Sequence, residues 1–150
     1  MMAVLEQGAP PEATGTLTVP AELERLDDVL ELVHAELERR DCPISVQNKL
    51  DIVIEELFVN VCSYAYQDRD ERGDCRVEYA YSPNPHTITL SITDWGIPFD
   101  PFAREDPVRP TSVEDAPIGG LGIFMVKQLC DGVRYLRDGD KNVVVIGKSW

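Results

Sequence analysis

The chain has 150 residues, of which 43% are hydrophobic and 27% are charged, a composition typical of one soluble globular domain. Its 27 acidic and 14 basic residues give a formal net charge of -13. This excess of acid argues against direct nucleic-acid binding, which depends on Lys and Arg neutralising phosphates, and favours a basic protein partner. No apolar run approaches the roughly 18 residues of a membrane span, so no membrane contact is expected. Four scattered cysteines without a Cys-x-x-Cys pair fit a reduced, cytoplasmic setting.

The N-terminal part of the chain predicts a short leader, a strand and a helix. Residues 1–13 lack periodicity and are expected to be a flexible leader, with the folded domain at 14–150. Residues 14–19 alternate as in a short strand, and Pro20 suits the first turn of the helix that follows. The apolar face of that helix consists of Leu23, Leu26, Val29, Leu30, Val33 and Leu37. Acidic residues coat the rest, which predicts a solvated face or, alternatively, a partner-docking surface: Glu22, Glu24, Asp27, Asp28, Glu31, Glu36 and Glu38.

A second helix, which ends near Tyr66, carries the most informative polar pair. Pro43 breaks the chain, and Ser45 is expected to cap the helix. Its buried stripe consists of Leu50, Val53, Ile54, Leu57 and Val61. Glu56 and Asn60 lie one turn apart at the shoulder of this stripe, whereas Glu55 points to solvent. The pair suits a hydrated cation and activation of a hydroxyl, although ordinary polar pairs at this spacing are common.

The remaining elements complete an antiparallel sheet. Residues 76–81 and 87–94 predict a hairpin, and residues 133–137 and 142–146 predict two more strands around Gly139 and Asp140. Between the two pairs lie a proline-rich stretch (95–118), long enough to be a lid, and a helix at 123–130. The predicted fold class is α+β, an α/β two-layer sandwich whose mixed, mostly antiparallel sheet has helices on one face.

Two further stretches are candidates for ligand binding. Asp94 continues the apolar face of its strand, so it is expected to point toward the core and to be hydrogen-bonded there. With Gly96 leaving room beside it, this carboxylate could accept a hydrogen bond from an amine such as that of adenine, although the same residues could simply end a strand. Gly119, Gly120, Leu121 and Gly122 open a helix, where free amides favour phosphate, or they form a hinge. The two histidines, His34 and His86, are expected to have structural or surface roles.

Taken together, three segments resemble a known family. EELFVNVCSYAY (55–66), DWGIPFDP (94–101) and GGLGIFMVKQLCDGVRYLRDGDKNVVVIGK (119–148) resemble the N box and the two glycine boxes of the GHKL ATPases. This superfamily includes gyrase, heat-shock chaperone, histidine kinase and MutL domains, and its ATP-binding domain has the Bergerat fold. The chain is most similar to the bacterial anti-sigma-factor serine kinases, and the resemblance spans about residues 14–148.

The resemblance implies a role for each matched residue. Glu56 corresponds to the proposed general base, and Asn60 to the residue that binds Mg2+. Asp94, with Gly96 beside it, corresponds to the aspartate that recognises adenine. Gly119, Gly120, Leu121 and Gly122 correspond to the loop at the ATP phosphates. The chain departs from the family at Tyr64, where a histidine is common, and at Ile118, where a basic residue is common; Arg104, Arg109 and Lys127 are alternatives for the missing positive charge.

The expected function is therefore that of an ATP-dependent serine kinase and switch protein with ATP and Mg2+ as cofactors. By resemblance, its partners would be an anti-anti-sigma protein with a STAS domain and a sigma factor. Whether the protein forms a homodimer is left open by the sequence. The alternative is a non-catalytic module that binds ATP, or has lost it, and acts by sequestering a partner.

Overall fold

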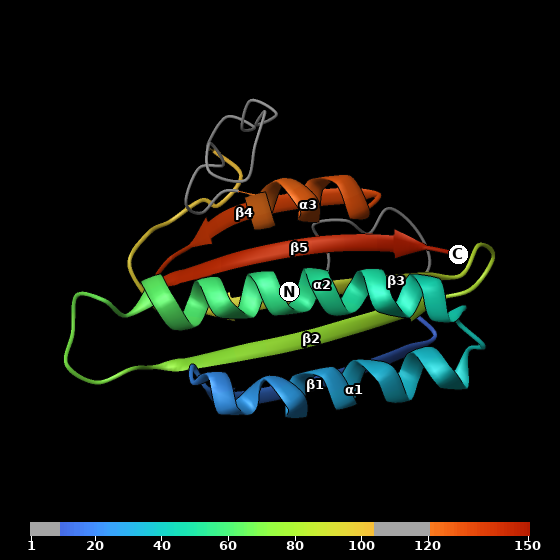
Figure 1. The fold of residues 1–150 in the computed structure, drawn as a ribbon, viewed down its shortest axis with the longest axis horizontal. Coiled ribbons are helices and arrows are strands. Elements are labelled where there is room, and N and C mark those ends of the chain that lie inside the picture. Colours follow the sequence, from blue (N-terminus) through green and yellow to red (C-terminus); the bar gives the residue numbers. More distant parts are fainter. Residues whose placement is uncertain (1–9, 104–120) are drawn as a thin grey trace, which may run out of the picture.

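The structure, a computed structural model, describes residues 10–103 and 121–150. Five strands and three α-helices follow one another along these residues (Figure 1), with a 3-10 turn before the first helix and a π-helical turn after the second. The order is β1 (Ala13–Pro20), the 3-10 turn (Leu23–Arg25), α1 (Leu26–Arg39), α2 (Ile44–Asn60), the π-helical turn (Val61–Ala65), β2 (Asp74–Ser82), β3 (Thr87–Asp94), α3 (Leu121–Leu129), β4 (Gly132–Asp138) and β5 (Lys141–Ser149).

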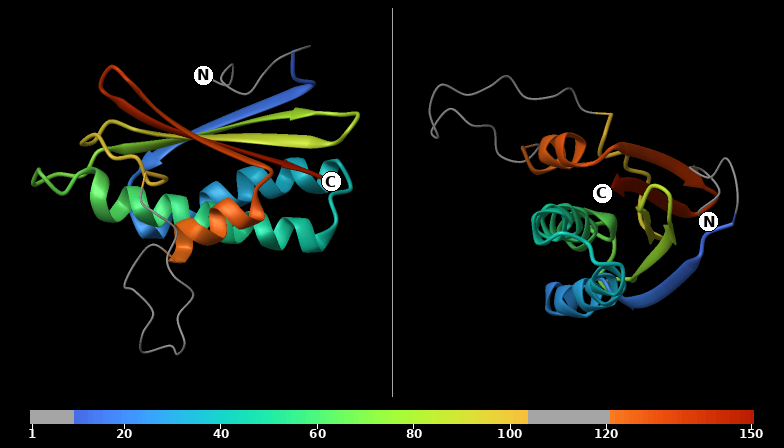
Figure 2. Two further views of the ribbon diagram at one scale, coloured as in Figure 1. Left: turned by 90° about the horizontal axis from the view of Figure 1, so that it is seen from above. Right: turned by 90° about the vertical axis from the view of Figure 1, so that its right-hand side faces the viewer.

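The strands form one sheet in the order β1-β2-β3-β5-β4, and every neighbouring pair is antiparallel. All three helices lie on the same face of the sheet, as the two side views in Figure 2 show. The predicted two-layer α+β fold is therefore confirmed, and among the described strands the sheet is wholly antiparallel. No helix among the described residues is both long enough and apolar enough to cross a membrane.

The core lies between α2 and the centre of the sheet. All five residues of the stripe predicted for α2 are at most 8% exposed. They pack in one apolar cluster with the inward-facing residues of β2 and β3, which include Val77, Leu90 and Ile92. Because Asp94 follows Ile92 at a spacing of two on β3, it also points into this layer and is only 6% exposed. The sheet and α2 together thus position the polar residues discussed below.

Two predictions about helix starts are wrong. Pro20 ends β1, where it pairs with Asp74, and the chain then makes a 3-10 turn before α1. Ser45 does not cap α2, because that helix begins at Ile44 and its N-cap residue is Pro43, whose side chain makes no capping hydrogen bond. The backbone satisfies amides of the first turn instead, because the Pro43 carbonyl accepts hydrogen bonds from the amides of Val46 and Gln47.

The predicted leader and lid lie partly outside the described residues. Of residues 1–13, only 10–13 are described, and Ala13 already belongs to β1. Of the predicted lid at 95–118, the segment 95–103 is described.

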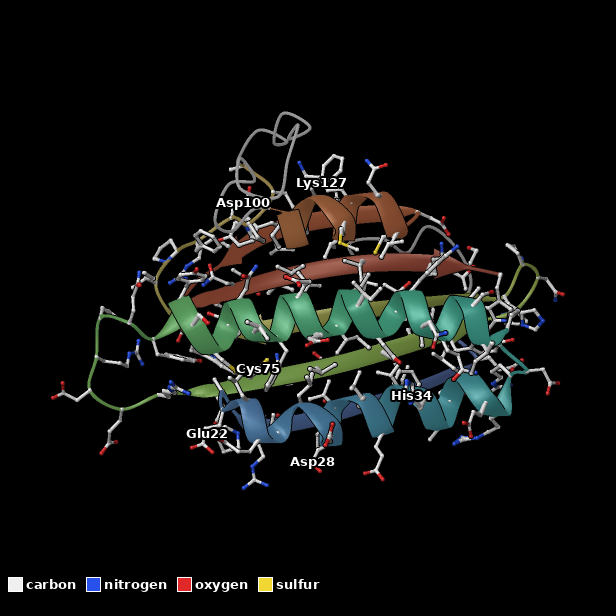
Figure 3. All side chains as sticks on the ribbon, viewed as in Figure 1. Glu22, Asp28, His34, Cys75, Asp100 and Lys127 are labelled. Atoms are coloured by element: carbon white, nitrogen blue, oxygen red, sulfur yellow. The ribbon has the colours of Figure 1, made fainter. Side chains whose placement is uncertain are left out.

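The two histidines have the structural roles that were expected of them. His34 of α1 hydrogen-bonds to Asp51 of α2, so it lies between the two helices (Figure 3). His86 precedes β3, and its Nδ1 lies 2.5 Å from the Tyr81 hydroxyl. Its ring stacks on Trp150 with a centroid separation of 5.4 Å. Both side chains therefore join elements of the fold.

The four cysteines are free thiols, and none forms a disulfide. Three are buried, and Cys130 is half-buried. Burial raises the pKa of every one of these thiols, to about 11 for Cys62. Because the thiolate is the reactive form, thiols with raised pKa values are poor nucleophiles and metal ligands at neutral pH.

One residue expected on the solvated face of the first helix is buried. Glu36 of α1 is only 1% exposed, so that part of the prediction is wrong. Its carboxylate accepts hydrogen bonds from Arg40 at 2.6 Å and from the Tyr79 hydroxyl at 2.9 Å. Burial would raise the pKa of Glu36, but the hydrogen bonds from Arg40 and Tyr79 and the nearby positive charges outweigh it, so the pKa lies below its usual value.

We expect Glu36→Gln to lower the free energy of unfolding by roughly 2–3 kcal/mol at pH 7, because hydrogen bonds to a charged group are lost. Since the pKa of Glu36 is lowered by folding, its contribution is complete above the unfolded value of 4.5 and is lost as the pH falls through the folded value. Urea unfolding at pH 7 and at pH 3 measures the effect, with Glu38→Gln as an exposed control on the same helix. A difference that stays constant with pH would contradict the role of the charge.

Candidate functional site

A hollow lies between the end of α2 and strands β3 and β5. Small-molecule sites are usually apolar with a few polar groups, and the hollow has this character. The apolar walls here come from Leu57, Val61, Ala65, Ile92, Phe99, Pro101 and Val144. The polar groups are Asn60, Asp94 and Asn142. The hollow therefore brings together two of the residues predicted from sequence, Asn60 and Asp94, with one that was not.

Asp94 is the polar group on the sheet side of the hollow. It is the last residue of β3, in register with Cys75 of β2 and Asn142 of β5. Its Oδ1 accepts hydrogen bonds from the Gly96 amide and from Asn142 Nδ2, both at 2.9 Å. The expectation that this carboxylate points inward and is hydrogen-bonded is confirmed. Its Oδ2 receives no hydrogen bond from the described residues and is the oxygen available to a ligand.

Sequence reasoning missed Asn142. It is 3% exposed and is the second residue of β5. A signal was present, because Asn142 shares the alternation of Val144 and Ile146, which face the core. A polar residue at the end of an inward-facing row is the same pattern that identified Asp94.

Gly96 lies so close to another part of the backbone that no side chain fits there. A Cβ at this position would lie 2.0 Å from the Ala65 carbonyl oxygen, which accepts a hydrogen bond of 3.0 Å from the Ile97 amide. Ala65 ends the π-helical turn that follows α2, and such turns are frequent at functional sites. The missing side chain thus allows the segment after β3 to close against the end of α2. Arg137 of β4 holds the same segment from the other side, donating to the Gly96 carbonyl at 2.8 Å.

Glu56 lies next to the start of α3 rather than in the hollow. It is half-buried while Glu55 is exposed, as the helical wheel predicted. A Cβ at Gly122, the second residue of α3, would lie 1.8 Å from Glu56 Oε2. The carboxylate therefore packs on the glycine backbone, and Gly122 makes room for it. Asn60, one turn further along α2, lines the hollow.

The other residues of the glycine segment can be placed only in part. Gly119 and Gly120 lie outside the described residues, and Leu121 is the first residue of α3. The predicted helix at 123–130 is thus confirmed, with a start two residues earlier and an end one residue earlier. Of the alternative sources of positive charge, Arg104 and Arg109 lie outside the described residues as well, and Lys127 is on α3 (Figure 3).

Two aromatic rings at the edge of the hollow were also not predicted as a pair. Phe99 lines the hollow, and its ring centroid lies 6.1 Å from that of Tyr64 in the π-helical turn. Both side chains are more than 40% exposed, with values of 43% and 46%. Exposed aromatic rings beside an apolar hollow offer a flat surface to a planar ligand.

The residues present fit a purine nucleotide. The walls are apolar, and one buried carboxylate presents an oxygen without a described partner, which suits a planar base that carries an amine. No group of three or more His, Cys, Asp or Glu side chains that could hold a metal ion occurs among the described residues. Mg2+ is commonly held by one or two protein groups together with substrate phosphates, and the side-chain oxygen of Asn60, which lines the hollow, is a donor of the kind that Mg2+ takes.

Comparison with known proteins agrees with this arrangement. Residues 19–148 match the family model described as the histidine kinase-like ATPase domain, which covers most of the chain. The chain belongs to this family. Membership in the histidine kinase-like ATPase family confirms the resemblance recognised from the three sequence segments.

Individual proteins within this family are also similar to the chain, in sequence or in fold. The chain is 32% identical over 100 residues to proteins named serine-protein kinase RsbW from Listeria monocytogenes and Listeria innocua. These matches cover 64% of the chain and 62% of each relative, so the chain spans about three fifths of their length. The crystal structure of the RsbU and RsbW domains of a Mycobacterium tuberculosis protein superposes with a TM-score of 0.63 over 92% of this chain and 32% of that one. At 14% identity, this last likeness concerns the fold.

The two described glycines of the site should respond differently to alanine. We expect Gly96→Ala to destabilise the protein by roughly 2–3 kcal/mol, because its Cβ would meet the Ala65 backbone, which cannot move cheaply. Gly122→Ala should change stability by less than about 1 kcal/mol, because only the end of the Glu56 side chain must move and alanine favours a helix. Urea unfolding of both variants tests the difference, and equal losses would contradict these contacts.

Proposed function

We propose that this protein is an ATP-dependent protein serine kinase that acts as an anti-sigma regulatory factor. Its substrate would be an anti-anti-sigma protein with a STAS domain, and a sigma factor would be the partner that it sequesters. The observation that carries the proposal is the hollow that both Asp94 and Asn60 line, with Glu56 one turn before Asn60 on the same helix. Family membership and the name of the Listeria relatives support the reaction class.

Each residue has a chemical task in this proposal. Asp94 Oδ2 accepts a hydrogen bond from the adenine amine, and the apolar walls take the ring. The side-chain oxygen of Asn60 is the type of ligand that Mg2+ prefers. The bound nucleotide supplies the γ-phosphoryl group. Glu56 accepts the proton of the serine hydroxyl while that oxygen bonds to phosphorus and ADP leaves.

A second candidate function is a non-catalytic module that binds a nucleotide and sequesters its partner. The departures from the family pattern at Tyr64 and Ile118 favour this alternative. The contact of Glu56 with Gly122 is compatible with either function. Nucleotide binding without transfer to any serine would identify the module.

We expect Glu56→Ala to lower the rate of phosphoryl transfer by roughly 10²- to 10⁴-fold, the usual contribution of a general base, with little change in ATP affinity. The assay follows radiolabelled phosphate from ATP to a candidate STAS protein. Glu55→Ala is the matched control, since this neighbouring acid is exposed. Undiminished transfer by the Glu56 variant would contradict its role as the base.

We expect Asp94→Asn to weaken ATP binding by roughly tenfold to a hundredfold, because a hydrogen bond to a charged acceptor is lost. Calorimetric titration with ATP and Mg2+ measures the affinity. Asp28→Asn serves as the control, because Asp28 is an exposed residue of α1 (Figure 3) and no residue of α1 is among those that line the hollow. Equal affinities for the Asp94 variant and the unaltered protein would rule out this contact with the base.

A further inference from the structure

Asn142 holds a buried position in which every hydrogen-bonding group of its side chain is used. Its Nδ2 donates to Asp94 Oδ1 at 2.9 Å and to the Ile97 carbonyl at 2.7 Å. Its Oδ1 accepts from the Phe99 amide at 3.1 Å and from the Tyr135 hydroxyl at 2.6 Å. A carboxamide has two N–H donors and an oxygen with two lone pairs, so these four bonds exhaust its capacity.

The orientation of this carboxamide is fixed by its backbone partners. The Ile97 carbonyl can only accept a hydrogen bond, and the Phe99 amide can only donate one, so the nitrogen and the oxygen of Asn142 cannot exchange places. Burial raises the pKa of Tyr135, which keeps its hydroxyl protonated and able to donate at neutral pH. Asn142 therefore presents an N–H group to Asp94 permanently.

This contact leaves Asp94 with one usable oxygen. Oδ1 is occupied by Asn142 and by the Gly96 amide, so the carboxylate cannot rotate without losing both bonds. A ligand in the hollow can then use only Oδ2. An ionised carboxylate with two free oxygens matches the adjacent N1–H and N2–H donors of guanine, which bind it in a bidentate manner. A carboxylate with one free oxygen suits a base with a single amine, as adenine has.

We infer that Asn142 is a specificity-determining residue, which selects adenine over guanine by occupying one oxygen of Asp94. The inference rests on the proposed function, since it concerns the base of the nucleotide that the hollow would hold. Asn142 is a positioning residue in this role, because it acts on the ligand through Asp94. The register of the sheet supports the arrangement, with Asp94 and Asn142 directly paired across β3 and β5.

The test compares the affinities for ATP and GTP in the full chain. Asn142→Leu keeps a similar side-chain volume and removes the donor, and Asn142→Ala removes the donor without adding apolar volume. Tyr135→Phe removes only one hydroxyl that bonds to Asn142 and leaves its backbone partners in place. Thr93→Val is the matched control, because Thr93 is a buried neighbour of Asp94 whose side chain points to the opposite face of the sheet. Calorimetric titration with each nucleotide and Mg2+ gives the ratio of the two dissociation constants.

We expect the unaltered protein and the Thr93 variant to prefer ATP, and the preference to fall by roughly tenfold in Asn142→Leu, the worth of about one hydrogen bond. Little change is expected in Tyr135→Phe, because Ile97 and Phe99 still hold the carboxamide. Because the ratio is measured on one sample, it does not depend on the fraction of protein that is folded. If Asn142→Leu does not fold, Asn142→Ala decides the question in the same way.

Two negative results would have different meanings. An unchanged ratio in Asn142 variants that still bind ATP would overturn the specificity role and leave the proposed function intact. Failure of the unaltered protein to bind either nucleotide would overturn the proposed function and this inference together.

Discussion

Burying a carboxylate at the end of β3 is the constraint on which this site depends. Taking Asp94 out of water is unfavourable unless donors replace the lost hydration. The protein supplies them from two directions, the Gly96 amide within the same turn and the Asn142 side chain from β5. Since Asn142 also binds Ile97 and Phe99, the same contact fixes the segment that forms one side of the hollow. A single polar junction thus orients the ligand-facing oxygen and shapes the space in front of it.

The two described glycines of the site show how the same residue type serves different ends. At Gly96 the neighbour is a carbonyl of the main chain, so the glycine lets two backbone segments meet. At Gly122 the neighbour is the end of the Glu56 side chain. Gly96 therefore matters for the stability of the fold, whereas Gly122 matters for the position of the Glu56 carboxylate. A pattern of glycines in a sequence cannot separate these cases, because it does not say what lies opposite.

Much of the fold and part of the site follow from periodicity alone. The stripe on α2, the exposure of Glu55 and the inward direction of Asp94 depend only on the repeat of a helix or a strand, and each is confirmed. Glu36 was misplaced because its burial depends on Arg40 and Tyr79, and the latter is distant in sequence. Asn142 was missed because its importance comes from pairing with β3, which a single strand does not reveal. The local sequence pattern predicts the direction in which a side chain points, whereas its hydrogen-bonding partners are known only from the tertiary structure.

The π-helical turn after α2 makes this part of the chain sensitive to its length. A π turn takes one more residue than an α turn to close its hydrogen bond, so residues 61–65 behave like a one-residue insertion in a regular helix. Its last carbonyl, that of Ala65, bonds to Ile97 in the segment beyond β3. Deleting one residue here would restore the regular α-helical repeat and remove the wider turn from which the Ala65 carbonyl reaches Ile97. The contact between the end of this helix and the segment beyond β3 therefore depends on the number of residues between Asn60 and Ala65.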